Sequence, residues 1–166
     1  MTHDSIILGI DPGYGRLGIA IIKKTKGTEI LIHSECFETK TNIPHPHRLL
    51  LIANKVKDII KEFSPDQLAI ENLLFGRNQK TALKVAEARG VILSEAARAN
   101  IALSEHNPKQ IKLAVTGYGK SDKLQVIDML HKIFKMKSKK KFDDEYDAIA
   151  VALTAAATPL STIRDI

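Results

Sequence analysis

The sequence predicts an α/β domain built on a mixed β-sheet. Three apolar runs rich in β-branched residues come first, at residues 5–11, 17–23 and 29–37, and short turns separate them. Neighbouring runs of this kind pair most simply as an antiparallel meander. Further strands then alternate with helical patterns, which indicates parallel strands joined by right-handed crossovers. The chain has 166 residues, enough to bury a core of its own.

The elements after the meander follow from periodicity and from turn residues. Apolar side chains at helical spacing predict a helix over residues 49–62, after the break at Pro44 and Pro46. A short strand follows at residues 67–71, and we expect it to lie parallel to the first strand. An alanine-rich helix at residues 80–100 leads to a last strand at residues 101–106.

The C-terminal third predicts three more helices. Pro108 opens the first, over residues 109–115, and Ser121 is a candidate cap for the second, which ends near Phe134. A lysine-rich loop follows, and Asp143 or Asp144 is expected to cap an alanine-rich final helix. No repeat or linker is visible, so we expect one domain over residues 1–158 and a tail over residues 159–166.

Composition limits the class of protein. Twenty-five Lys and Arg residues exceed nineteen Asp and Glu residues, a formal charge of +6 that favours an anionic partner. Cys36 is the only cysteine, which excludes an internal disulfide and zinc-type cysteine pairs. No basic segment precedes the first apolar run, and no apolar stretch approaches the roughly 20 residues that span a bilayer. We therefore expect a cytoplasmic protein with no membrane contact.

Four acidic residues form the candidate site. Asp11 and Glu71 end two strands that are expected to be parallel neighbours, so their carboxylates should meet at one edge of the sheet. Asp144 and Asp147 are three residues apart at the start of the last helix and share one of its faces. Like charges this close stay ionised only when cations neutralise them. Oxygen ligands select Mg²⁺ or Mn²⁺, and two such ions could activate water against a phosphodiester.

These residues lie in segments that resemble the RuvC family of Holliday junction resolvases. The resemblance runs from ILGIDPGYGRLGIAII through LAIENLLFGRN, KVAEARGVIL and NPKQIKLAVTGYGKSDKLQV to DDEYDAIAVAL, which is nearly the whole chain. It implies an RNase H-like five-stranded sheet of order 3-2-1-4-5 with helices on both faces, and a homodimer that makes paired cuts in four-way junction DNA. It also implies RuvA and RuvB as branch-migration partners, and catalytic, metal-binding roles for Asp11, Glu71, Asp144 and Asp147.

The resemblance also suggests DNA contacts. Lys112 and Lys123 lie in the segment similar to the family's DNA-contacting region, and Phe75 is the aromatic residue left to stack on a base after the second acid. Further basic residues after that loop are candidates for phosphate contacts: Arg77, Lys80 and Lys84. The family commonly has a second aromatic beside Phe75 and a histidine in the last helix, and this chain has Leu74 and Ala155 there.

Three other functions fit parts of the sequence. Residues 114–121, AVTGYGKS, match a loose phosphate-loop pattern, which would make the chain an ATP-binding protein if a strand preceded them. GIDPGYGRLGIA also resembles the opening of YqgF-type nucleases, which are linked to ribosomal RNA processing. A non-catalytic nucleic-acid binding module would keep the sheet and need none of the acids. Cleavage in the presence of Mg²⁺ distinguishes an enzyme from such a module.

Overall fold

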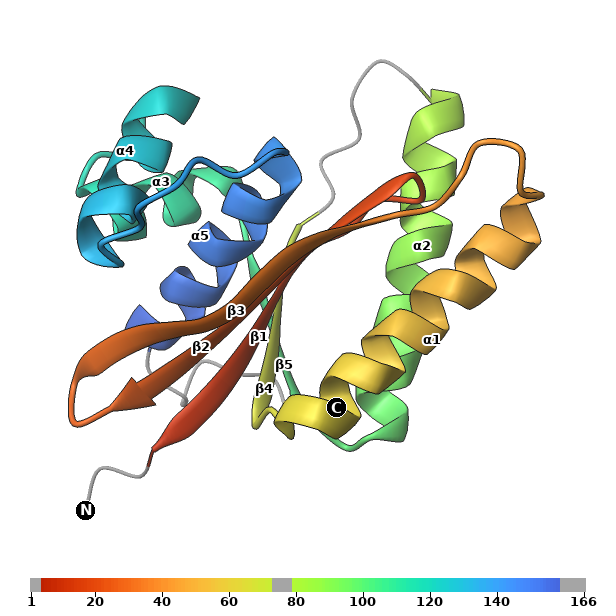
Figure 1. Cartoon of the computed structure of the whole chain (residues 1–166), viewed down its shortest axis with the longest axis horizontal. Helices are drawn as coiled ribbons and strands as arrows, with labels where there is room; N and C mark the ends of the chain where they lie inside the picture. The colour runs from red at the N-terminus through yellow and green to blue at the C-terminus, as the bar shows by residue number, and fades with distance from the viewer. Residues whose placement is uncertain (1–3, 73–78, 159–166) are drawn as a thin grey trace.

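The sheet has five strands in the order β3-β2-β1-β4-β5 (Figure 1). The computed structural model describes residues 4–72 and 79–158, and the side chains of residues 79 and 80 are outside that description. The strands are β1 Ser5–Asp11, β2 Arg16–Thr25, β3 Thr28–Glu38, β4 Gln67–Glu71 and β5 Ala102–His106. This order confirms the RNase H-like topology expected from the resemblance.

The first three strands form the expected meander. β1 pairs antiparallel with β2, and β2 pairs antiparallel with β3. The tight turn between β2 and β3 uses two residues with positive φ, Lys26 at 48° and Gly27 at 81°, which suits the twist of a two-residue hairpin. The chain then crosses over through a helix, so β4 lies parallel to β1, and β5 lies parallel to β4. The predicted pairing of the first and fourth strands is therefore confirmed.

Helices cover both faces of the sheet (Figure 1). One layer holds α1, His45–Phe63, and α2, Gln79–Arg98, which pack against each other. The opposite face is covered by α5, Asp143–Ala157, with α3, Pro108–Thr116, and α4, Lys123–Ile133, packed on its outer side. The lysine-rich segment between α4 and α5 contains no helix or strand, as predicted.

Three predicted helix starts were wrong. α1 begins at His45, a turn earlier than expected, because Pro46 occupies the first turn, where no backbone N–H is needed. α4 is capped by Asp122 in place of Ser121: its carboxylate accepts a 2.9 Å hydrogen bond from the backbone of Gln125. α5 has Phe142 at its cap position, so Asp143 and Asp144 both lie inside the first helical turn.

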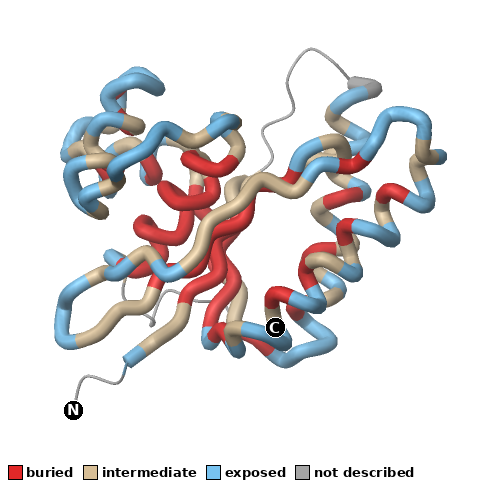
Figure 2. Tube along the Cα trace, viewed as in Figure 1, coloured by how far each residue is buried: buried red, intermediate tan, exposed pale blue. Residues whose placement is uncertain are grey.

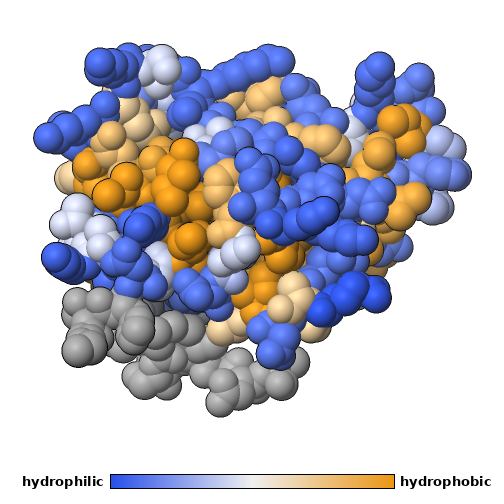
Figure 3. Space-filling view, turned by 60° about the horizontal axis from the view of Figure 1, so that its bottom comes forward, coloured by the Kyte–Doolittle hydropathy of each residue, from blue (hydrophilic) through white to orange (hydrophobic). Residues whose placement is uncertain are grey.

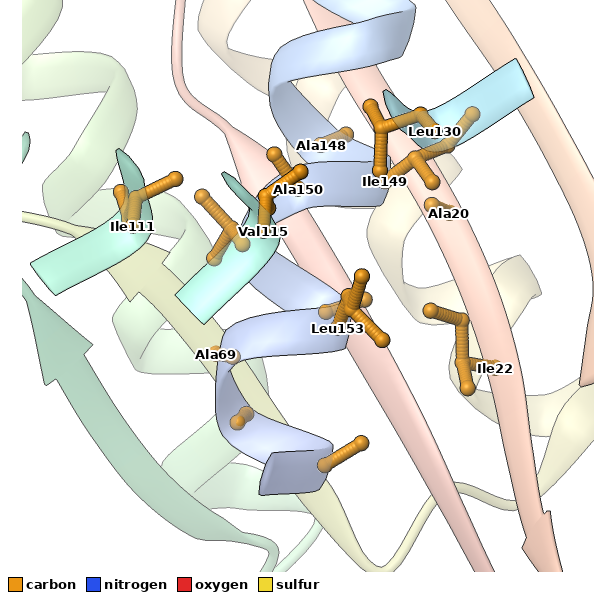
Figure 4. Close-up of a cluster of buried hydrophobic side chains, with 14 of the residues drawn as sticks. Ala20, Ile22, Ala69, Ile111, Val115, Leu130, Ala148, Ile149, Ala150 and Leu153 are labelled. Atoms are coloured by element: carbon orange, nitrogen blue, oxygen red, sulfur yellow. The ribbon is translucent and has the colours of Figure 1, made fainter. Parts of the chain in front are cut away.

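The two faces of the sheet carry separate hydrophobic clusters. Alternate β1 residues divide between them: Leu8 and Ile10 pack under α1 and α2, whereas Ile7 packs under α5. Figure 2 shows the buried residues concentrated in the sheet and in α5, with exposed residues on the outer helices. α5 is buried on nearly all sides because the sheet lies beneath it and α3 and α4 lie above it (Figure 4).

Glycines in β1 and β2 allow α5 to lie directly on the strands. A Cβ atom at Gly9 would stand 2.4 Å from the backbone oxygen of Ala148 and 2.6 Å from the Cβ atom of Ala152. A Cβ atom at Gly18 would stand 1.9 Å from the backbone oxygen of Asp144. Small residues on both surfaces therefore set the distance between helix and sheet.

On the face shown in Figure 3, hydrophobic side chains form patches between hydrophilic ones. Exposed large hydrophobic residues include Leu50 of α1 and Leu83 of α2, which are 56% and 63% exposed. Within residues 4–72 and 79–158, no helix combines the length and apolar character needed to cross a bilayer. The predicted tail at residues 159–166 lies outside the described residues, so that domain boundary stays a prediction.

Adding a methyl group at Gly9 tests the close approach of α5. We expect Gly9→Ala to lower the free energy of unfolding by about 1–3 kcal/mol or more, since the atoms it meets are backbone and Cβ atoms that cannot rotate away. Gly90→Ala is the control, because no atom lies within 4 Å of a Cβ atom there, and it should stabilise α2 by about 1 kcal/mol. Urea unfolding measures both, and equal effects of the two substitutions would contradict the packing argument.

Candidate active site

Asp11 and Glu71 end neighbouring parallel strands on the same face of the sheet. The register pairs Ile10 of β1 with Ile70 of β4, so the next residues, the two acids, stand side by side. Strand alternation puts Asp11 on the face of Ile7 and Glu71 on the face of Ala69, which is the face that α5 covers. The predicted convergence of these acids is confirmed.

α5 brings the second pair of acids to the same place. Gly18 lies opposite Asp11 in the β1–β2 register, and its missing side chain admits the backbone of Asp144. Asp147 follows one turn later and lines the same hollow as Glu71. Acidic residues in the first turn are also favoured by the partial positive charge of the helix N-terminus.

Burial and the three neighbouring acids make Asp11 difficult to ionise. Burial raises the pKa of Asp11 to about 8, and the negative charges of Asp147, Asp144 and Glu71 add to that rise. Burial penalises a carboxylate because water no longer solvates its charge, and nearby like charges increase the penalty. Asp11 is therefore the member of the cluster that most needs a cation if it is to stay ionised.

The neighbouring acids respond in the same direction. Burial, and then the charge of Asp147, raise the pKa of Glu71. Burial also raises the pKa of Asp147, although a hydrogen bond from Lys123 opposes that rise. Raised carboxylate pKa values beside a hollow are typical of functional sites, because the chemistry of such sites needs groups whose pKa values are shifted.

Two basic side chains partly neutralise the cluster. The Nζ atom of Lys123 lies 2.8 Å from an oxygen of Asp147 and 3.3 Å from an oxygen of Asp143. Although burial opposes it, the hydrogen bond to Asp147 leaves the pKa of Lys123 above its usual value. The Nε atom of Arg16 lies 3.2 Å from Asp144. Neither periodicity nor a motif had indicated that Arg16 or Asp143 belongs to this site.

A hollow of about 300 Å³ opens beside the acids. Glu71, Asp147, Lys112 and Lys123 line it together with apolar residues of α3, α4 and α5. The positive charge of Lys112 acts on Glu71 and opposes the rise of its pKa. Lys112 and Lys123, which the sequence suggested only as DNA contacts, therefore stand at the acids themselves.

The donor set fits a hard divalent cation. Every acidic ligand candidate offers carboxylate oxygens, which Mg²⁺ and Mn²⁺ prefer, and the pKa of Asp11 reflects negative charge that a cation would relieve. In the described part of the chain, no three His, Cys, Asp or Glu side chains are gathered tightly enough to share one ion. Lys123 and Arg16 instead hold oxygens of Asp147 and Asp144.

The remaining predicted DNA contacts have different outcomes. Phe75 and Arg77 lie outside the described residues, and so does the side chain of Lys80. Lys84 is exposed on α2, and its Nζ atom lies 5.4 Å from the centroid of the Tyr14 ring. Its position is on the α1 and α2 side of the sheet, away from the face that carries the acids.

The phosphate-loop interpretation of residues 114–121 is wrong. A phosphate loop connects a strand to a helix, but α3, Pro108–Thr116, occupies the place where that strand would have to be. Gly117 instead ends α3 with a positive φ of 77°, the ordinary role of a glycine after a helix.

A protein-family model described as crossover junction endodeoxyribonuclease RuvC matches residues 7–155. The chain belongs to the RuvC family. Its similarity to RuvC of Desulfitobacterium hafniense is 38% identity over 151 residues, which cover 91% of this chain and 92% of that protein. RuvC of Petrotoga mobilis is 42% identical over 147 residues, covering 89% of this chain and 90% of that protein.

A solved RuvC structure has the same fold. T. thermophilus RuvC in complex with a Holliday junction substrate superposes with a TM-score of 0.89 at 30% identity, covering 98% of this chain and 99% of that one. RuvC relatives of nearly equal length favour the junction-resolving nuclease class over the YqgF-type alternative and over a non-catalytic binding module. The chain is thus an endodeoxyribonuclease by family.

The high pKa of Asp11 predicts a pH-dependent cost to folding. The unfolded carboxyl ionises near pH 4, whereas the folded one holds its proton to about pH 8, so stability should fall as pH rises between these values. Asp11→Asn removes this cost, and we expect its melting temperature without metal to exceed that of the unaltered protein at pH 8 and to match it near pH 4. Asp58→Asn, an exposed change on α1, is the control. A pH-independent difference would contradict the burial of this charge.

Removing the charge of Lys123 should lower the melting temperature at pH 8, whereas Asp11→Asn should raise it. Lys123→Gln leaves Asp147 and Asp143 without their shared cation, so the melting temperature in EDTA at pH 8 should fall. Added Mg²⁺ should raise the melting temperature of this variant more than that of the unaltered protein. Lys120→Gln, an exposed lysine before α4, is the matched control. Equal Mg²⁺ responses in both variants would show that Lys123 does not neutralise these carboxylates.

Proposed function

We propose that this chain resolves four-way DNA junctions by hydrolysing one phosphodiester bond at each of two opposed strands. The observation that carries the proposal is the convergence of Asp11 and Glu71 from β1 and β4 with Asp144 and Asp147 from α5. Family membership and the likeness to a RuvC bound to a Holliday junction support the substrate.

Asp11, Glu71, Asp144 and Asp147 are the proposed Mg²⁺ ligands, with two ions for each site and Mn²⁺ as a substitute. When bound, the metal would act as a Lewis acid on the phosphate and lower the pKa of the attacking water. The ligands would also be freed from Lys123 and Arg16, whose side chains now hold two of them.

The basic residues of the site would then serve the DNA. Lys112 and Lys123 line the hollow beside the acids, where their ammonium groups would bind phosphate oxygens next to the scissile bond. Such contacts orient the phosphate and offset the negative charge that develops on it during attack. Each cut would leave a 5′-phosphate and a 3′-hydroxyl, which a ligase can join. Phe75, Arg77 and Lys80 remain candidates for contacts to the junction.

Paired cuts require two sites with a fixed mutual orientation. We propose that a homodimer supplies them, because two-fold symmetry presents equivalent sites to equivalent strands of the junction. RuvA and RuvB are the proposed partners that move the branch point, and the cytoplasm is the proposed location, where the lone Cys36 stays reduced.

The decisive test compares substrates with and without Mg²⁺. A synthetic four-way junction, a linear duplex and an RNA hairpin are each incubated with the protein, and symmetric nicks in the junction alone are expected. Preferential cutting of the RNA hairpin would replace this function with the ribosomal RNA alternative.

Removing single ligands tests the roles of the acids. Asp11→Asn or Glu71→Gln should slow junction cutting by more than about 100-fold, because even the outer partners of metal ligands contribute about 10–100-fold. Junction binding in EDTA should be kept or strengthened, since each change removes negative charge near the phosphates. Asp58→Asn serves as the exposed control. Full activity in both ligand variants would refute the assignment.

A further inference from the structure

Arg48 of α1 is a buried cation that forms no ion pair with a carboxylate of the described residues. Its residue surface is 8% exposed, and no ion pair of Arg48 occurs within residues 4–72 and 79–158. Residues 73–80 contain no Asp or Glu. A buried, unpaired charge lowers the stability of the folded protein, so its presence needs a compensating anion or function.

Within the described residues, the hydrogen bonds of Arg48 use only part of its guanidinium group. Its Nε atom donates to the hydroxyl of Thr39 at 2.8 Å, and Nη2 lies 3.5 Å from the backbone oxygen of the same residue. Thr39 is neutral, so these bonds orient the side chain without balancing its charge. A guanidinium group has five N–H donors in a planar fork, which suits the two oxygens of a phosphate.

A second cation meets Arg48 at one aromatic ring. The guanidinium carbon of Arg48 lies 5.0 Å from the centroid of the Tyr14 ring, and Nζ of Lys84 lies 5.4 Å from it. His45 contacts the same ring edge-on at 5.7 Å. The acid at this cluster, Glu87, pairs with Nε2 of His45 at 2.5 Å and forms no ion pair with Arg48 or Lys84.

The basic cluster of Arg48, Lys84 and His45 around Tyr14 stands next to the acids, on the other side of the sheet. Tyr14 belongs to the loop that follows Asp11, and this loop is tied to Thr39 by hydrogen bonds to the backbone oxygens of Tyr14 and Gly15. Arg48 and Lys84 come from α1 and α2, whereas the acids face α5 (Figure 1). The end of β1 therefore separates a negative site from a positive one.

We propose that Arg48 and Lys84, both positioned over Tyr14, each bind a phosphate of the DNA backbone outside the metal site. The inference rests on the proposed function, since a strand cut at the acids carries further phosphates to either side of the scissile one. Arg48 supplies a fork already oriented by Thr39, and Lys84 supplies an exposed charge on the outer helix. The pair would hold the flanking strand on the α1 and α2 side.

The test measures junction affinity in EDTA over a series of salt concentrations. Each phosphate contact contributes about 0.9 to the slope of log K against log salt, so Arg48→Gln and Lys84→Gln should each lower the slope by about that amount. If the affinities are equal when extrapolated to 1 M salt, a slope change of about 0.9 lowers the affinity of each variant at 0.1 M salt by about eightfold. Lys57→Gln, which removes an exposed charge further along α1, should leave the slope unchanged.

One additional variant, Arg48→Lys, and one competitor, inorganic phosphate, separate the explanations. Arg48→Lys keeps the charge and should restore most of the slope, whereas a purely structural role through Thr39 would predict no recovery of binding beyond that of Arg48→Gln. Lys84 is exposed, so Lys84→Gln carries the test even if Arg48→Gln unfolds. Inorganic phosphate should raise the melting temperature of neither the unaltered protein nor Lys84→Gln. If it stabilises the unaltered protein but not Lys84→Gln, the site binds free phosphate instead of DNA.

The outcomes distinguish this site from the proposed function. Unchanged slopes in Arg48→Gln and Lys84→Gln, in a protein that still binds and cuts junctions, would overturn the phosphate site alone. If the unaltered protein binds linear duplex but no junction, the same slope changes on duplex would support the site and reject the junction as substrate. Failure to bind any DNA would overturn both.

Discussion

The close contact between α5 and the centre of the sheet is the constraint on which the rest depends. Gly9 and Gly18 leave no side chain between the strands and the helix, and the small residues Ala148 and Ala152 face them. The same contact that buries the helix also carries Asp144 to the end of β1, beside Asp11. Packing and chemistry thus share one geometric requirement: a larger residue at Gly18 would separate the acids as well as loosen the core.

This arrangement stores electrostatic strain in the metal-free protein. Burial and neighbouring charges raise the pKa of Asp11 to about 8, while Lys123 and Arg16 form ion pairs with Asp147 and Asp144 beside it. Divalent cations would relieve the same repulsion, so metal binding and the rearrangement of two basic side chains are coupled by charge balance. The imbalance at Arg48 is the opposite, because this buried cation forms no ion pair with a carboxylate of the described residues.

Much of this site followed from patterns in the chain. Apolar runs ending in Asp11 and Glu71 implied adjacent strand ends, and the helical spacing of Asp144 and Asp147 placed them on one face. The helix starts were less accurate, because Pro46, Asp122 and Phe142 were each one of several possible boundaries, and hydrogen bonds decide among them. Arg16 and Arg48 carried no signal at all, since a single arginine on a strand or helix is ordinarily a surface residue.

The sequence by itself determined the family, the strand order that the family resemblance implies, and the placement of the four acids at two strand ends and one helix. These depend on residue identity and on spacing along the chain. Only the tertiary structure decided which cations meet which acids. Lys123 reaches Asp147 and Asp143 from another helix, and Lys84 and Arg48 meet over Tyr14 from two different helices. Such contacts depend on the packing of helices on opposite faces of a sheet, and local periodicity does not encode that packing.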